Sequence, residues 1–465
     1  MSQQIYGMAK ICDGVCPFSY NSENEKITVY TGTSPIEIED GTDTIIGQPF
    51  EMYIGGYSLY KLSVPLSNCC TTIEEGKIKQ VAGLDQIRSV EYVIKNYHEN
   101  SKYSEMRLQF PELDYFIPSV SRTTVSDSGI TFSRSKDVVD EFEIQYYDTI
   151  VSISFCLKMQ VTTSFKAIAK TISEVEVKFP ETDDLNYIIN LYNDIRCFFS
   201  FVCNRLNIGL RSAILIGSYP KKTLEKNKLI DKITYKNQYT KQDLIISQKY
   251  LEPMEDKKSI SKTLRYRYFK SNLKELFQLF FEKTSEDTAI INNGSFHHSL
   301  KYRNLIDLQQ SLHIVATFEY YMRTLLPEIS SQSTRDVYDD IKKLISKYAE
   351  SAKGKKKKKA NDLIKSLVPQ ISLSEKIRKV YDGYSNWNPL TTILYEQFGD
   401  DISNLASVAN SWRNELAHDK RTFTPNEDVI HAIRLIEHIN YCIVLREAGY
   451  SDDEIKLIIN KLLSK

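Results

Sequence analysis

ISNLASVANSWRNELAH, residues 402–418, shows what kind of fold closes this chain. Its apolar residues recur every three or four positions, a spacing typical of one buried helix face. They are Ile402, Leu405, Ala406, Ala409, Trp412 and Leu416. Arg413, Asn414 and His418 lie beside that stripe at helical spacing. We therefore predict a helix that buries one side and presents these three polar residues on the neighbouring side, with Trp412 in the core or in a dimer seam.

The next segment sets the end of this helix. Thr424 and Pro425, with Glu427 three residues after Thr424, predict that a new helix starts here with Thr424 as its cap. His418 would then lie in the last turn of the preceding helix, where the backbone carbonyls favour a protonated imidazole. Histidine can donate or accept a proton near neutral pH. Arg and His are also common in last turns simply because they suit the helix dipole.

Helical patterns extend to both sides of this stretch. From about residue 300 to the end we predict an all-α bundle of about five or six helices. The expected helices cover residues 305–326, 337–348, 361–384, 402–420, 426–445 and 452–463.

The first third of the chain has the pattern of strands. In TIVSISFCLKMQV, residues 149–161, apolar and more polar residues alternate, which predicts a strand with one buried face. Residues 26–32 and 129–135 have a similar pattern. We expect an antiparallel sandwich or rolled sheet over about residues 20–175.

The middle of the chain mixes helices with irregular stretches. Thr182, Asp183 and Asp184 predict a helix start, followed by an apolar stripe from residue 185 to 202. A second stripe covers residues 273–281, and the polar stretch 221–268 is expected to be a loop. The sequence thus predicts an α+β multidomain chain. Residues 1–175 form an antiparallel β-rich, sandwich-like domain, residues 176–299 a helical and irregular segment that packs on it, and residues 300–465 the helical bundle.

Composition excludes several classes of protein. The chain has 60 basic and 60 acidic residues, so its net charge gives no signal for nucleic-acid binding and any such surface must be local. It has no run of 18 apolar residues and no secretory leader pattern at residue 1, so we expect a cytoplasmic protein with no membrane partner. Its eight Cys are then expected to be reduced thiols.

Three stretches of the bundle resemble one known family. RNELAH at residues 413–418 matches the R-x-x-x-x-H motif of HEPN domains, which often has Asn second. VATFEYYMRTLL at 315–326 and IEHINYCIVLREAGYSDDEI at 436–455 resemble the flanking helices in ApeA-like bacterial anti-phage proteins. FFSFVCNRLNIG at 198–209 resembles the domain that precedes HEPN in that family. The HEPN resemblance covers roughly residues 300–465.

This resemblance implies a metal-independent endoribonuclease that acts as a homodimer, with the motifs of two subunits forming one composite site. It implies abortive infection, with the N-terminal domain restraining the nuclease or sensing a phage-derived trigger, and RNA, such as tRNA, as substrate. Arg413 suits phosphate binding, Asn414 a supporting hydrogen bond and His418 proton transfer. Glu319 matches an acidic family position and would hold Arg413; pairing with Arg323 four residues on is the alternative. Catalysis would need no cofactor.

Two other readings of the whole chain stay open. In the first, the HEPN bundle is a non-catalytic scaffold that only dimerises or holds a nucleotide. In the second, the chain is the toxin half of a toxin–antitoxin pair and is silenced by a partner.

A lysine run offers a second surface for RNA. Lys355, Lys356, Lys357, Lys358 and Lys359 could bind RNA phosphates, although such runs are more often solvated loops.

The remaining Cys and His residues allow further predictions. Cys12, Cys16, Cys69 and Cys70 are candidate ligands of a structural zinc, with reduced structural thiols as the alternative. Cys197, Cys203 and Cys442 lie on apolar helix faces and are expected in the core, whereas we expect His98, His297 and His298 at the surface.

Overall fold

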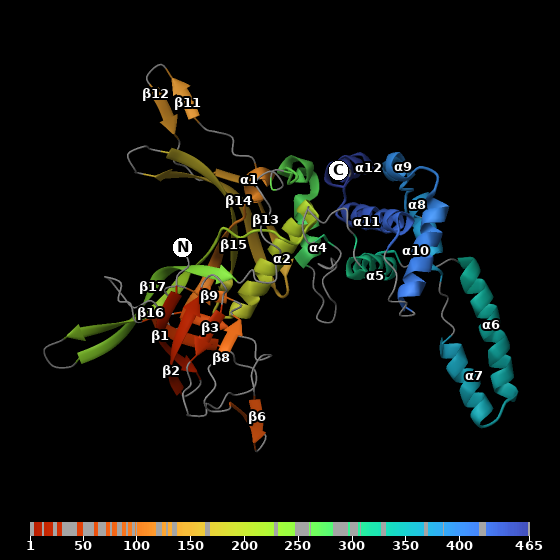
Figure 1. Cartoon of the computed structure of the whole chain (residues 1–465), viewed down its shortest axis with the longest axis horizontal. Coiled ribbons are helices and arrows are strands. Elements are labelled where there is room, and N and C mark those ends of the chain that lie inside the picture. The colour runs from red at the N-terminus through yellow and green to blue at the C-terminus, as the bar shows by residue number, and fades with distance from the viewer. Residues whose placement is uncertain are drawn as a thin grey trace. The chain divides into compact units, whose positions relative to one another are not determined.

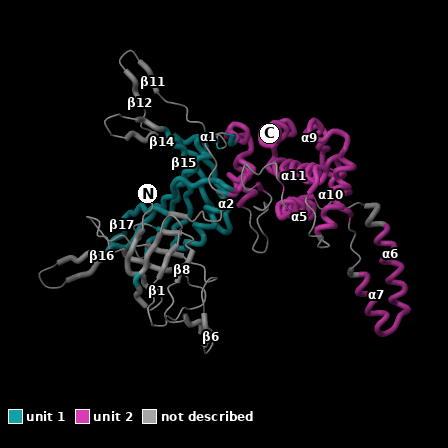
Figure 2. Tube along the Cα trace, in the orientation of Figure 1, with its two compact units in different colours: residues 1–196, 207–263 teal, residues 197–206, 264–465 magenta. Residues whose placement is uncertain are grey.

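The structure is a computed structural model in which the chain divides into two compact units (Figure 2). Unit 1 comprises Met1–Arg196 and Asn207–Thr263, and unit 2 comprises Cys197–Leu206 and Leu264–Lys465. The structure describes residues 100–463 except 118–122, 127–128, 133–136, 163–167, 227–230, 247–259, 261, 282–295, 298–305, 307, 327–331, 367–370, 385 and 418–424. Before residue 100 it describes residue 98 and the strands named below.

Unit 1 is built on an antiparallel sheet (Figure 1). In the described part of the chain this sheet has 13 strands, and adjacent strands run antiparallel throughout. Their order is β13 (Asp137–Tyr146), β14 (Thr149–Thr162), β15 (Ile168–Thr182), β10 (Lys102–Gln109), β16 (Ser212–Lys226), β17 (Asp231–Ile246), β9 (Tyr92–Ile94), β5 (Tyr60–Ser63), β4 (Thr44–Pro49), β1 (Gln4–Ile11), β2 (Gly14–Asn21), β3 (Lys26–Val29) and β8 (Gln86–Ser89).

Two separate hairpins accompany this sheet. They are β6 (Thr71–Glu74) with β7 (Lys77–Gln80), and β11 (Thr123–Ser126) with β12 (Gly129–Phe132).

Strand β14 confirms the alternation seen in the sequence but is more buried than predicted. Its apolar positions Val151, Ile153 and Phe155 are fully buried. Ser154 on the opposite side is also buried, and its hydroxyl donates to Glu141 of β13 at 2.7 Å. On the same side, Lys158 pairs with Glu174 of β15. Because the polar side chains on this side have partners, both sides of the middle of the strand can be shielded from water.

Helix α2 (Leu185–Cys203) contacts this sheet through its unit 1 residues, because the ring of Tyr187 meets those of Tyr146 on β13 and Phe179 on β15. Asp184 caps it as the sequence predicts, because its carboxylate accepts from the backbone N–H groups of Asn186 and Tyr187 at 2.9 and 3.2 Å. The Tyr146 hydroxyl of β13 donates to Asp194 at 3.0 Å. The one short helix before α2 in the described residues is α1 (Leu113–Phe116).

The prediction of a loop over residues 221–268 is wrong, because that range contains the end of β16 and all of β17. Thr240, Gln242 and Leu244 of β17 are buried at period two. Two of these three residues are polar, so a search for apolar alternation misses the strand. Gln242 can be buried because its side chain accepts from the Tyr103 hydroxyl at 2.6 Å and donates to Thr240 at 3.2 Å.

Unit 2 is helical. Its described α-helices beyond α2 are α4 (Leu273–Phe281), α5 (Leu308–Thr324), α6 (Gln332–Ser351), α7 (Lys355–Ser366), α8 (Leu373–Asp382), α9 (Thr391–Phe398), α10 (Ile402–Ala417), α11 (Glu427–Glu447) and α12 (Asp452–Leu462). Two 3-10 turns, Tyr266–Tyr268 and Lys270–Asn272, precede α4. The antiparallel sheet followed by helices confirms the predicted α+β class.

Three details of the bundle differ from the sequence prediction. The single helix expected over 361–384 is two helices, α7 and α8, and α9 was not predicted. Helix α11 is capped by Asn426, whose side chain accepts from the Val429 N–H at 2.9 Å, so Thr424 and Pro425 precede the cap.

Among the described residues, no helix has both the length and the apolar character needed to cross a bilayer. The three-part division at residues 175 and 299 stays a prediction.

Candidate active site

Helix α10 is fixed in the bundle by the apolar stripe predicted from the sequence. Ile402, Leu405, Ala406, Ala409 and Trp412 are buried, whereas Leu416, the last residue of the predicted stripe, is only half-buried. The indole N–H of Trp412 donates to the Ser311 hydroxyl of α5 at 3.3 Å. Trp412 is 2% exposed, which confirms its predicted place in the core. The register between α10 and α5 therefore determines where the next residue, Arg413, can reach.

Arg413 lies at the surface between α10 and α5. One guanidinium nitrogen is 3.6 Å from a carboxylate oxygen of Glu319 on α5, and another donates to the Asn414 side chain at 3.4 Å. The structure thus brings together three of the four residues predicted for the site. It records this ion pair for Glu319 and none between Glu319 and Arg323, both of which it describes.

The guanidinium remains accessible despite these contacts. The Arg413 side chain is 43% exposed and that of Glu319 is 28% exposed. A guanidinium has five N–H donors in a planar fork, so the two contacts leave it able to bind an anion through others. The ion pair with Glu319 can therefore orient the Arg413 guanidinium and still leave N–H donors exposed for an anion.

The fourth predicted residue, His418, lies outside the described residues. It directly follows Ala417, the last residue of α10. Its role in the site stays a prediction from the sequence.

The lysine run lies on a helix, although the sequence left a loop as the alternative. Lys355, Lys356, Lys357, Lys358 and Lys359 form the first turns of α7 and are all exposed. Helix α7 packs against α6. The structure records no contact between these described lysines and Arg413. Binding of RNA by this run stays a prediction.

The four Cys predicted for zinc are described only in part. Cys12, Cys69 and Cys70 lie outside the described residues, and Cys16 lies in β2 with its side chain not described. Elsewhere in the described chain, no group of three or more His, Cys, Asp or Glu side chains is arranged to hold a metal ion. Zinc binding stays a prediction, whereas Cys197, Cys203 and Cys442 are buried, as predicted.

A buried polar cluster on α11 was missed by the sequence analysis. The Glu437 carboxylate accepts from the Asn204 amide at 3.0 Å and is bonded to His297 Nε2 at 3.1 Å. The other ring nitrogen of His297 is 2.9 Å from the Gln310 amide. His297 is only 2% exposed, so its predicted surface position is wrong, because hydrogen bonds on both ring nitrogens satisfy it in the interior. His98 is partly buried against Tyr219, and His298 lies outside the described residues.

This cluster holds Glu437 ionised inside the bundle. Burial alone would raise the pKa of its carboxyl, but His297, His438 and the Asn204 hydrogen bond lower that pKa to about 2. The bonds join α11 to residues more than 100 positions away in the chain, so no local pattern reveals them. The one signal in the sequence that could have revealed the cluster is the position of Glu437 among the mostly apolar residues 432–445.

Comparison with known proteins identifies the class of the chain. A sequence model of the Apea-like HEPN domain matches residues 312–454, which include α10, α11 and most of α5. A model of ApeA N-terminal domain 1 matches residues 54–207. No curated protein and no solved structure matches the chain.

The C-terminal bundle that presents Glu319, Arg413 and Asn414 is therefore a HEPN domain. HEPN domains are often ribonucleases, and they commonly dimerise and bind RNA. With both domain matches in this order, the chain is an ApeA-like HEPN protein, related to defence.

Proposed function

We propose that the chain is a metal-independent endoribonuclease that acts in anti-phage defence by abortive infection. The observation that carries the proposal is the accessible guanidinium of Arg413, held by Glu319 and beside Asn414 on the HEPN domain. The N-terminal domain would regulate the nuclease in response to a phage-derived trigger, and tRNA is a candidate substrate.

The proposed chemistry uses the 2′-hydroxyl of the RNA as its nucleophile. That oxygen attacks the adjacent phosphorus, the bond from phosphorus to the 5′-oxygen breaks, and a 2′,3′-cyclic phosphate forms. His418 takes the proton from the 2′-hydroxyl, and an acid returns a proton to the leaving 5′-oxygen. Arg413 stabilises the negative charge of the phosphorane, and Asn414 supports it by hydrogen bonding. Each role needs only side chains, so no metal enters the scheme.

A composite site in a homodimer supplies both the base and the acid. If two motifs meet, His418 of one subunit removes the proton and His418 of the partner subunit returns one. Two Arg413 guanidinium groups brought together repel each other unless an anion lies between them. A bound phosphodiester relieves that repulsion and receives both cations.

An RNA cleavage assay in excess EDTA tests the proposal. With an extract of phage-infected cells added to supply the trigger, we expect the wild-type chain to cut RNA and both Arg413→Ala and His418→Ala to lose that activity. Arg378→Ala is the matched control, because Arg378 is an exposed Arg of the same bundle whose contact is a hydrogen bond to Ser374. Circular dichroism should show all three variants folded.

The possible outcomes separate the alternative readings. Absence of cleavage by the wild-type chain both alone and with an extract of phage-infected cells that supplies the trigger, or equal cleavage by Arg413→Ala, overturns the nuclease and favours a scaffold. If the wild-type chain cuts RNA without EDTA but not in excess EDTA, the metal-independent chemistry is overturned. Cells that die on expressing this chain alone, without phage, would favour a toxin that needs a separate antitoxin.

A further inference from the structure

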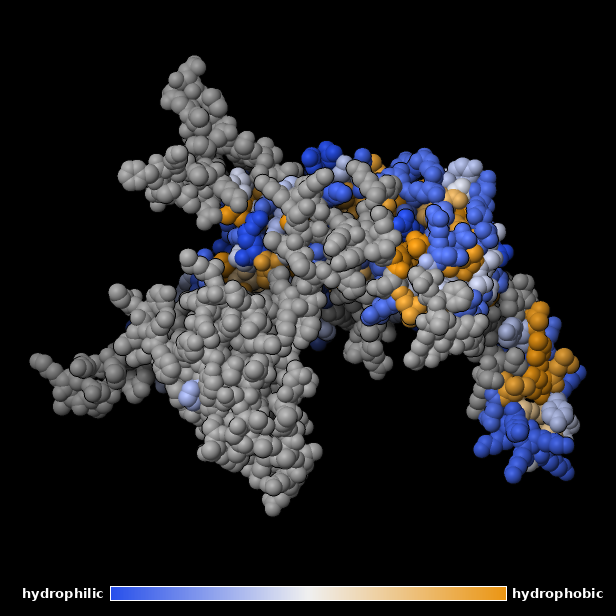
Figure 3. All heavy atoms as spheres, viewed as in Figure 1, coloured by the Kyte–Doolittle hydropathy of each residue, from blue (hydrophilic) through white to orange (hydrophobic). Residues whose placement is uncertain are grey.

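Helices α6 and α7 form a hairpin (Figure 1). Helix α6 carries an exposed apolar stripe. The stripe consists of Val337, Ile341, Leu344 and Tyr348 of α6, which are 38% to 67% exposed. Their spacing of four, three and four residues places them on one helix face. Figure 3 shows apolar surface gathered on this hairpin. Contiguous exposed apolar surface of this kind marks an interaction site.

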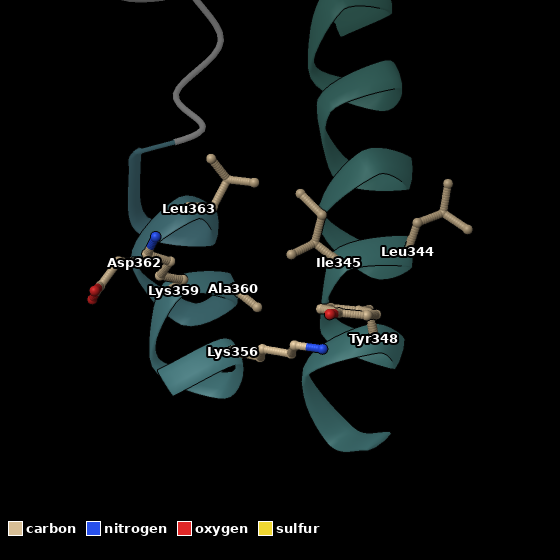
Figure 4. Close-up of a pocket in the computed structure, with 8 residues that line it drawn as sticks. All are labelled: Leu344, Ile345, Tyr348, Lys356, Lys359, Ala360, Asp362 and Leu363. Carbon is tan, nitrogen blue, oxygen red and sulfur yellow. The ribbon is translucent and has the colours of Figure 1, made fainter. Parts of the chain in front are cut away.

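A groove lies between α6 and α7, and its lining includes Leu344 and Tyr348 of the stripe (Figure 4). Its volume is about 860 Å³. Ile345 of α6 and Ala360 of α7 point into the space between the helices. Leu363 adds apolar surface on the α7 side, Lys356 and Lys359 add positive charge, and Asp362 adds one negative charge. The surface therefore suits an amphipathic helix.

The spacing of the stripe selects the kind of helix. Four-three-four spacing is that of the core positions a and d in a heptad repeat. With Val337 and Leu344 at d and Ile341 and Tyr348 at a, the stripe forms four successive core positions of one helix. A helix with the same repeat is the natural partner, and this chain carries such a helix in α6 itself.

The charges beside the stripe select the direction of pairing. Asp340 and Lys347 occupy successive g positions, and both are exposed. When two such helices pair antiparallel with Ile341 against Leu344 of the partner subunit, g faces g. Asp340 then meets Lys347 of the partner subunit, and symmetry forms this pair twice.

Parallel pairing of the same helices forms no such ion pair. In that arrangement g faces e, and the e position after Asp340 is Ile345. Ile345 already faces the groove toward α7. Antiparallel pairing is the one that uses both charges.

We propose that the α6 stripe binds the α6 stripe of a second copy of this chain, antiparallel, so that two hairpins form a four-helix contact. In the single chain, Asp340 bonds to Lys343 at 3.1 Å, with both side chains about three-quarters exposed at 74% and 76%. An ion pair that exposed is weak, so Asp340 can exchange it for the partner's lysine or share both. The contact depends on α6 and α7 alone and holds whether or not Arg413 serves in RNA cleavage.

Disulfide trapping tests both the contact and its direction. In antiparallel pairing, residue 337 faces residue 348 of the partner, whereas the two copies of residue 337 are about 16 Å apart along the helix, at 1.5 Å per residue. A disulfide requires Cα atoms within about 7 Å. We expect an oxidised mixture of Val337→Cys and Tyr348→Cys chains to form a cross-linked dimer, and each variant alone to give only the wild-type background.

Each outcome of this experiment bears on the proposal. Cross-linking by Val337→Cys alone would mean parallel pairing and overturn the assigned direction. No cross-link above the wild-type background in the mixture would overturn the contact. Because both positions are exposed, neither substitution should unfold the chain. The readout is a cross-link and does not involve RNA cleavage. A failure of the proposed nuclease function would therefore be distinguished from a failure of this contact.

Charge reversal adds a second test within the same cross-linking mixture. Asp340→Lys introduced into both chains places like charges opposite each other twice and should reduce the cross-linked fraction at least severalfold. Adding Lys347→Asp to both chains recreates opposite charges and should restore the cross-link. Asp339→Lys is the matched control, because Asp339 is exposed and lies on the same helix away from the stripe. A cross-link that is indifferent to Asp340→Lys, or not restored by the second change, would overturn the assigned charge pairing.

Discussion

Replacing Glu319 by Gln removes the charge that faces Arg413 and keeps the size of the side chain. The two groups are 3.6 Å apart, and their side chains are 28% and 43% exposed. Ion pairs this exposed contribute about 0.2–1 kcal/mol, because water and salt screen them. We expect Glu319→Gln to lower the free energy of unfolding by less than about 1 kcal/mol in urea denaturation.

RNA cleavage should respond more strongly to the same change. If Glu319 orients the guanidinium toward the phosphate, losing the carboxylate should slow cleavage about 10-fold, equivalent to about 1.4 kcal/mol of barrier. Adding Glu319→Gln to Arg413→Gln should cause little further loss, because no guanidinium is left to orient. Glu447→Gln, an exposed Glu at the end of α11, is the matched control and should cleave at the wild-type rate.

Three results would refute this reasoning. Wild-type cleavage by Glu319→Gln would leave Glu319 as an ordinary surface partner of Arg413. Additive losses in the double variant would mean that the two residues act separately. A loss of stability well above 1 kcal/mol would show that the pair is more important to folding than its exposure implies.

Three further predictions concern the bundle that carries the site. Trp412→Ala should lower the free energy of unfolding by about 3–5 kcal/mol in urea denaturation, because it empties a buried site and removes the bond to Ser311. The Glu437 carboxyl has its pKa lowered from 4.5 to about 2, so its stabilisation is present above pH 4.5 and lost as pH falls toward 2. Acid unfolding should show a loss of about 3 kcal/mol over that window, and Glu437→Gln should flatten it. Ser451→Ala removes the cap of α12 and should cost about 1 kcal/mol, measured as a lower Tm.

Local signals in the sequence predicted the elements that carry the site. The apolar stripe of α10 placed Trp412 in the core and Arg413 and Asn414 beside it, as the structure has them. The last helix, predicted over residues 452–463, is α12, and its capping box of Ser451 and Glu454 was not used in that prediction. Helical period depends on neighbours within one or two turns, so one sequence is enough to predict it, whereas the cap predicted at Thr424 was wrong by two residues.

Features that depend on distant residues were not predicted. Strand β17 is polar at buried positions, and only its partners Tyr103 and Ser101 in the folded sheet explain why Gln242 can lie there. Glu437 likewise needs Asn204 and His297, which fall in other parts of the chain. Glu319 lies 94 residues before Arg413, and family resemblance rather than spacing suggested the pair.

Cleavage of a modified RNA tests the central claim most directly. The purified chain is incubated in EDTA with one RNA in two forms, unmodified and 2′-O-methylated throughout, and the product ends are analysed. We predict that only the unmodified RNA is cut, that its products end in 2′,3′-cyclic phosphate, and that Arg413→Ala cuts neither. Equal cutting of the methylated RNA, or products with free 3′-hydroxyl ends, would contradict the proposed mechanism.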